Sequence, residues 1–156
     1  MKGTTRTILL AVAALGLSTQ GFAASTTGAA KQIVITALSI ANVSDLDFGT
    51  GAQGDVAKTV APGTAEDASN GSFTVTGQAN TAYTITLPTA PVTLTTGGGG
   101  VNETISVDTF TSFPATTGTI GAGGTQLLLV GATRAALGAA QAPGTYTGNY
   151  TVTVVY

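Results

Sequence analysis

The C-terminal residues 144–156 (GTYTGNYTVTVVY) alternate between large apolar and small polar side chains. Successive side chains of a β-strand point to opposite faces, so this pattern places an apolar ridge on one face and a row of threonines on the other. Gly148 is the one gap in the ridge. The ridge consists of Tyr146, Tyr150, Val152, Val154 and Tyr156. The pattern predicts a half-buried strand and constrains the chain to a sheet-based fold.

Short runs rich in threonine, valine and isoleucine recur along the rest of the chain, separated by glycine, proline and asparagine. This composition is typical of strands joined by turns, and the spacing favours a sandwich or a small barrel. The alanine-rich residues 132–142 resemble a helix, but Gly138 and Pro143 make a single turn or an irregular strand an equal expectation. Strands are expected at residues 32–40, 45–48, 56–60, 72–76, 82–87, 92–95, 104–110, 125–130 and 144–156.

The N-terminal end has the pattern of a secretory signal peptide. Lys2 and Arg6 precede the apolar residues 8–17, and residues 21–23 (GFA) form a small-x-small cleavage site. The apolar run is too short to span a membrane, because a spanning helix needs about 20 such residues. We therefore expect a signal peptide at residues 1–23, a flexible segment at 24–31 and one domain at 32–156. The mature chain is expected to be exported, to a periplasmic, cell-surface or extracellular location, and not to span the membrane.

Several functional classes are disfavoured by residues that the chain lacks. After the signal peptide only three basic residues remain against all seven acidic ones, so no basic surface is available for nucleic acid. The sequence has no histidine and no cysteine, which removes the usual ligands of zinc and the base of a hydrolytic triad. No disulfide can support the fold. These absences predict a protein that is not an enzyme and that needs no metal and no cofactor.

Two motifs that suggest chemistry have simpler interpretations. Residues 49–54 (GTGAQG) match the glycine pattern of dinucleotide-binding loops, but residues 55–60 are strand-like and no βαβ unit is present. An ordinary glycine turn is the better interpretation. Six of the acidic residues could in principle form a catalytic pair, and two of them, Asp45 and Asp47, could bind calcium. We expect them instead to be solvated on loops and strand faces. They are Asp45, Asp47, Glu66, Asp67, Glu103 and Asp108.

Four stretches together resemble a bacterial exported family known as domain of unknown function 4402. They are residues 46–50 (LDFGT), 73–87 (FTVTGQANTAYTITL), 130–133 (VGAT) and 142–156 (APGTYTGNYTVTVVY). That family is in turn similar to the spore coat protein U group, which includes pilins of archaic chaperone–usher systems. The resemblance implies an all-β, immunoglobulin-like (pilin-like) β-sandwich of about 7–9 short antiparallel strands. It also implies that one strand can be supplied by a neighbouring subunit.

The resulting expectation is a structural protein of a fimbria or coat, serving cell adhesion, that assembles by β-strand complementation. Its partners would be copies of itself or related subunits, together with a periplasmic chaperone. The expected assembly residues are Ile33, Ile35, Leu38 and Ile40 near the N-terminal end, and the ridge of Tyr146, Tyr150, Val152, Val154 and Tyr156. The sequence leaves open whether residues 32–40 are lent to a neighbour or kept as the first strand. The alternative function is a stand-alone secreted module that binds a glycan or another cell-surface component.

Overall fold

The computed structural model describes residues 21–156, so residues 1–20 of the signal peptide predicted at residues 1–23 lie outside the described part of the chain. The described residues divide into two units, of which 21–33 belong to the first and contain neither helix nor strand. The second unit, Val34–Tyr156, carries every strand. None of the described segments forms a helix of the length and hydrophobicity that a membrane span requires.

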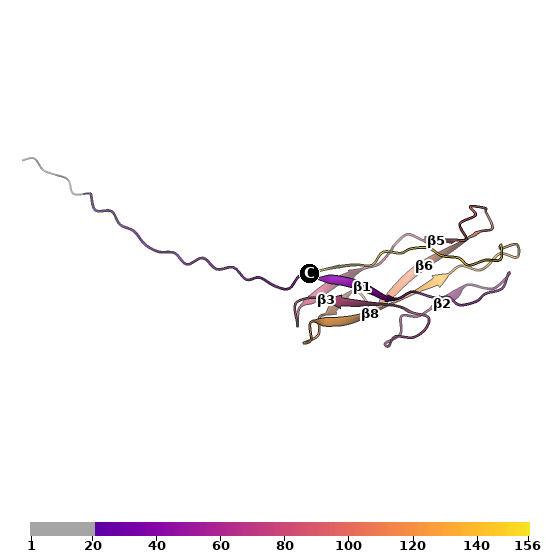
Figure 1. Ribbon diagram of the computed structural model, residues 1–156, viewed down its shortest axis with the longest axis horizontal. Helices are drawn as coiled ribbons and strands as arrows, with labels where there is room; N and C mark the ends of the chain where they lie inside the picture. Colours follow the sequence, from indigo (N-terminus) through magenta and orange to yellow (C-terminus); the bar gives the residue numbers. More distant parts are fainter. Residues whose placement is uncertain (1–20) are drawn as a thin grey trace, which may run out of the picture. The chain divides into compact units, whose positions relative to one another are not determined.

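The second unit is an all-β sandwich of two antiparallel sheets (Figure 1). The larger sheet has the strand order β1-β3-β8-β6-β5, and β2 also pairs with β8. The smaller sheet has the order β7-β4-β9. The strands are β1 (Ser39–Ser44), β2 (Lys58–Val60), β3 (Gly71–Thr76), β4 (Ala82–Thr86), β5 (Val92–Thr95), β6 (Thr104–Phe113), β7 (Thr117–Thr119), β8 (Thr125–Arg134) and β9 (Thr153–Val155).

The core of the sandwich lies where the smaller sheet covers the larger one. Alternation along β3 and β8 turns Val75 and Leu128 inward, and alternation along β4 turns Tyr83 and Ile85 toward them. Ile120 completes this buried cluster. Partly buried side chains pack around the cluster: Leu38, Ile40, Phe73, Leu87, Val152 and Val154. The predicted all-β sandwich is therefore confirmed.

Several predicted boundaries are wrong, and the differences have a common cause. The first strand begins at Ser39 rather than at residue 32, and residues 45–48 form no strand. The C-terminal strand is reduced to Thr153–Val155, and the predicted strand from residue 125 continues through Arg134. Residues 135–142 are not helical, and β7 was not predicted. A strand exists only where a neighbouring strand completes its ladder, and the sequence pattern does not report the neighbour.

Candidate functional site

A cleft of about 1030 Å³ lies over the inner face of the larger sheet. Its floor is formed mainly by β5 and β6, whose inward-facing side chains are apolar. The smaller sheet does not extend over these strands, because β4 and β9 pair only as far as Thr86 and Thr153. The floor residues are Phe73, Val92, Leu94, Ile105, Val107 and Phe110. Ile105 and Val107 are only 8% and 2% exposed, and the other floor residues are half-buried. The cleft is thus a part of the sandwich interior that side chains and the rims partly enclose but that no strand of residues 21–156 covers.

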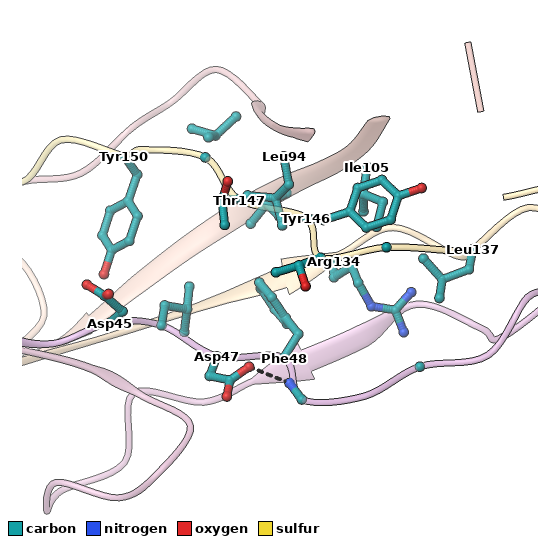
Figure 2. Close-up of a pocket in the computed structure, with 18 of the residues that line it drawn as sticks. Asp45, Asp47, Phe48, Leu94, Ile105, Arg134, Leu137, Tyr146, Thr147 and Tyr150 are labelled. Carbon is teal, nitrogen blue, oxygen red and sulfur yellow. Dashed lines mark hydrogen bonds between the residues drawn. The ribbon is translucent and has the colours of Figure 1, made fainter. Parts of the chain in front are cut away.

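Two extended segments form the rims of the cleft. One rim is residues 45–51, which continue from β1, and the other is residues 142–150, which lead to β9. Figure 2 shows Asp45, Asp47 and Phe48 along the first rim and Tyr146, Thr147 and Tyr150 along the second. Within the described part of the chain, no backbone hydrogen bond joins one rim to the other. Each rim therefore presents a backbone edge that a further strand can pair with.

The second rim forms no ladder because β4, the strand that pairs with β9, ends before it reaches the rim. β4 ends at Thr86, and Pro88 and Pro91 follow in the connection to β5. Proline has no N–H to donate and cannot continue a ladder. Thr147 instead pairs with Thr95, whose backbone N–H and C=O both bond to it at 2.9 and 3.0 Å. The predicted strand at residues 144–156 therefore keeps its alternation of faces but forms a ladder only at its end.

Tyr150 closes the end of the cleft nearest the core. Its ring centroid lies 5.3 Å from that of Phe110 and 6.1 Å from that of Phe73. Its hydroxyl is buried without a hydrogen-bond partner among residues 21–156 and points toward Asp45 (Figure 2). The glycine at position 71 makes room for this hydroxyl, because a Cβ there would overlap it. Burial, and secondarily the negative charge of Asp45, raises the pKa of Tyr150 to about 12.

The raised pKa of Tyr150 predicts a loss of stability in alkali. The unfolded chain ionises this tyrosine near pH 10, whereas the folded protein resists ionisation up to about pH 12. Stability is therefore unaffected below pH 10 and falls as the pH rises between these two values. Urea unfolding across this range should show a smaller loss for Tyr150→Phe than for the wild type. Equal losses in the two proteins would contradict the assignment to Tyr150.

The opposite end of the cleft contains polar groups that are already engaged. The amide nitrogen of Gln141 donates to the carbonyls of Asn102 and Thr104 and to the hydroxyl of Tyr146, at 2.8, 3.1 and 2.9 Å. The Tyr146 hydroxyl in turn donates to the Ala142 carbonyl at 2.6 Å. These bonds hold the start of the second rim in place. The unengaged features of the cleft are the apolar floor, one oxygen each of Asp45 and Asp47, and those rim backbone groups that lie between the bonded ones at Asp47 and Thr147.

Arg134 is the one basic side chain that lines the cleft within residues 21–156. It is 6% exposed and shares the inward parity of Leu128, Val130 and Ala132 on β8. Its guanidinium donates to the Ala135 carbonyl at 2.8 Å and to the Val56 carbonyl at 3.3 Å. It forms no ion pair with a carboxylate of the described chain. A buried charge satisfied only by carbonyls is uncommon, because burial normally requires a counter-charge.

The predicted N-terminal assembly residues fall into two groups. Leu38 and Ile40 pack against the protein's own core, so this part of residues 32–40 is kept. Ile33, Val34 and Ile35 are 73%, 85% and 50% exposed. The boundary is Thr36, whose N–H donates to the Gln78 side-chain oxygen and whose carbonyl accepts from the Tyr156 hydroxyl, at 3.2 and 2.9 Å. Residues 24–36, termed the arm, therefore end at a fixed point on the sandwich.

The predicted C-terminal assembly residues lie on two different surfaces. Val152 and Val154 pack against the core, and Tyr156 holds Thr36. Tyr146 and Tyr150 line the cleft. The prediction did not include the floor or Arg134, which reach the site through strand pairing. The floor could have been identified from the alternation of apolar residues along two expected strands, at Val92, Leu94, Ile105 and Val107. This alternation shows which side chains face inward, but it does not show whether another strand covers them.

No group of three or more His, Cys, Asp or Glu side chains within residues 21–156 is placed to hold a metal ion. A family model described as "Domain of unknown function (DUF4402)" matches residues 38–156, which is more than half of the chain. No curated protein and no solved structure matches the chain significantly.

Proposed function

The chain belongs to the DUF4402 family of domains of unknown function, and from its uncovered cleft we propose that it is a non-enzymatic structural subunit of a cell-surface appendage or coat. In this proposal subunits assemble by β-strand complementation. An extended segment of another subunit enters the cleft, pairs with the rim backbones and covers the apolar floor. The observation that carries the proposal is the apolar cleft between two rims that share no backbone hydrogen bond.

The arm supplies a segment of the required kind. Ile33 and Ile35 are large, apolar and exposed, and in an extended conformation they share one face. Exposed apolar side chains on both faces of an unpaired segment favour association with another surface. The fit is completed by the rims, which offer unpaired backbone groups on both sides of an inserted strand. The arm of another copy is therefore the proposed occupant, and a related subunit with a similar arm would serve equally.

The protein's own arm cannot fill its own cleft with these residues. Ile33 lies three residues from the fixed Thr36, so it reaches at most about 11 Å from that point. The nearest cleft residue along β1 is Asn42, six residues from Thr36, which is about 20 Å at the rise of an extended strand. Tyr150 is likewise six residues from Tyr156, which holds Thr36. Complementation by Ile33 and Ile35 must therefore take place between molecules.

A contact of this kind is heterologous, because the arm of one copy meets the cleft of the next. Heterologous contacts that do not close into a ring extend into open filaments. An uncovered cleft and a free arm are both aggregation-prone before assembly. The proposal therefore includes a periplasmic chaperone that covers the cleft until an arm replaces it. Export follows from the expected signal peptide at residues 1–23, of which residues 1–20 lie outside the described part of the chain.

Glycan binding by a stand-alone module is the second candidate, and the cleft favours it less. A sugar site needs unengaged donors and acceptors around an exposed aromatic face. At the polar end of the cleft, the Gln141 amide nitrogen and the Tyr146 hydroxyl already donate within the protein. The Gln53 amide nitrogen donates to the Gln141 carbonyl. The rest of the lining combines the apolar floor, the backbone of the rims and the carboxylates of Asp45 and Asp47, which suits an extended peptide with a basic residue.

The proposal predicts that an arm peptide stabilises the protein in trans. A synthetic peptide of residues 24–36 should raise the melting temperature of the full mature chain in a concentration-dependent way, because it binds the folded state alone. At a hundredfold excess over Kd the gain is about 2.7 kcal/mol. The matched control is the same peptide with Ile33→Asp and Ile35→Asp. The proposal fails if neither peptide has an effect, and a glycan that protects instead would support the second candidate.

A further inference from the structure

The charged residues that line the cleft are divided between its two ends. Asp45 and Asp47 lie at the end near Tyr150, and Arg134 lies toward the opposite end with Leu137 (Figure 2). No other aspartate, glutamate, lysine or arginine of residues 21–156 is among the lining residues. The cleft therefore has an acidic end and a basic end.

The charges at both ends lack counter-ions within the described chain. One oxygen of Asp45 accepts from the Asn42 amide at 2.7 Å, and one oxygen of Asp47 accepts from the Gly49 N–H at 2.7 Å. The second oxygen of each carboxylate accepts no hydrogen bond from residues 21–156. Arg134 is bonded to two carbonyls, neither of which carries a charge. A charged occupant would therefore meet two exposed aspartates and one buried arginine, none of which forms an ion pair within residues 21–156.

Two further charges near the first rim do not change this polarity. Asp55 accepts from the Ala52 N–H at 2.8 Å, and Lys58 donates to the Phe48 carbonyl at 2.7 Å. Neither side chain lines the cleft. Asp55 and Arg134 both lie beside Gly51, whereas Lys58 lies beside Gly49, close to Asp47. Each of the two therefore reduces the charge at one end of the cleft without reversing its sign.

The arm carries one charge, and it lies on the same face as its two isoleucines. Lys31 is the one charged residue of the arm, and alternation puts Lys31, Ile33 and Ile35 on a common face. In an extended strand Lys31 and Ile35 lie about 13 Å apart. When the two isoleucines cover the floor, Lys31 must therefore lie toward one end of the cleft.

We infer that the arm enters the cleft with Lys31 beside Asp45 and Asp47 and with Ile35 toward Arg134. This inference rests on the proposed function and fixes the direction of the inserted strand. The opposite direction would bring the lysine ammonium toward a buried guanidinium, and like charges across an interface are strongly disfavoured. The occupant of the cleft is then an extended segment in which a basic residue is followed by apolar residues at the second and fourth positions after it.

This direction makes the arm antiparallel to the segment that leads into β9. An arm that runs from the acidic end to the basic end is parallel to residues 45–51 and antiparallel to residues 144–150 (Figure 2). Every ladder in the described sandwich is antiparallel. The inserted strand would extend the smaller sheet beside β9 in the same manner. Antiparallel pairing is slightly more stable per residue than parallel pairing.

Disulfide cross-linking tests the direction, because the chain contains no cysteine of its own. A disulfide requires Cα atoms within about 7 Å. Full mature chains with Ala29→Cys, which keep Lys31, are mixed with chains carrying either Asn149→Cys at the acidic end or Leu137→Cys at the basic end, and oxidised mildly. A mixed disulfide is expected with Asn149→Cys and not with Leu137→Cys. A cross-link at Leu137→Cys alone overturns the direction but retains the proposed function, whereas the absence of both cross-links overturns the two together.

Charge reversal tests the contact itself. Lys31→Glu should weaken assembly about five- to tenfold in dilute buffer, and the difference should shrink as salt is added. The same chain with Asp45→Lys and Asp47→Lys should recover assembly. Gln32→Glu is the matched control, because it adds a negative charge on the opposite face of the arm. Equal weakening by Lys31→Glu and Gln32→Glu, or no recovery in the swapped protein, would overturn the contact.

Discussion

The variant Ile33→Asp is expected to abolish assembly of the mature protein while its fold remains intact. Ile33 is 73% exposed, so the substitution removes no core contact and should leave the free energy of unfolding unchanged within about 0.5 kcal/mol. In the assembled state the same side chain would lie over the apolar floor of the next subunit. Burying an unpaired carboxylate there costs several kcal/mol, and about 3 kcal/mol already lowers an association constant more than a hundredfold.

The adjacent residue provides the control for this experiment. Val34 is 85% exposed and lies on the opposite face of an extended arm, so Val34→Asp introduces the same charge without placing it against the floor. Light scattering coupled to size-exclusion chromatography should show oligomers for the wild type and Val34→Asp, and monomers for Ile33→Asp. Monomers for all three at high concentration would refute strand complementation by the arm. Oligomers for all three would show that another surface drives assembly.

The variant Leu128→Ala is expected to cause the largest loss of stability among single truncations on β8. Its side chain is fully buried in the cluster between the two sheets, together with Val75, Tyr83, Ile85 and Ile120. Truncation removes the transfer free energy of the lost atoms and leaves a cavity, at a cost of about 2–5 kcal/mol. Equilibrium urea unfolding of the full mature chain measures this change directly.

The neighbouring leucine gives a matched comparison for the truncation. Leu127 points to the other face of β8 and is 41% exposed, so Leu127→Ala should cost about 1 kcal/mol or less. The pair differs in burial and not in the atoms removed. Equal losses for the two variants would show that the inward and outward faces of β8 are assigned incorrectly. Such a result would also remove the basis for placing Arg134 inside the cleft.

The sequence pattern predicted most of the secondary structure, because alternation and turn residues are local properties. The runs at residues 72–76, 82–87 and 92–95 coincide with β3, β4 and β5 to within a residue. The faces of the C-terminal segment follow the predicted alternation, with Val152 and Val154 toward the core and Thr151 and Thr153 exposed. The absence of histidine and cysteine likewise limits the possible chemistry, and this limit depends on composition alone.

The predicted candidate site was incomplete, because it depends on which strands are neighbours. Nothing in residues 45–48 distinguishes a paired strand from the unpaired rim that they form. The sequence also did not decide whether residues 32–40 are lent to a neighbouring subunit or kept as the first strand. The structure divides them at Thr36, where Gln78 and Tyr156 bind the backbone.

The sequence by itself thus determined the fold class, the faces of the strands and the excluded chemistries, since these follow from side-chain type and period. The tertiary structure decided where ladders stop, and therefore where the sandwich is open. It also brought Asp45, Asp47 and Arg134, which are distant in sequence, to the two ends of one cleft. The physical reason is that a strand edge is unpaired when the fold brings no other strand beside it, and which strands become neighbours depends on the whole chain.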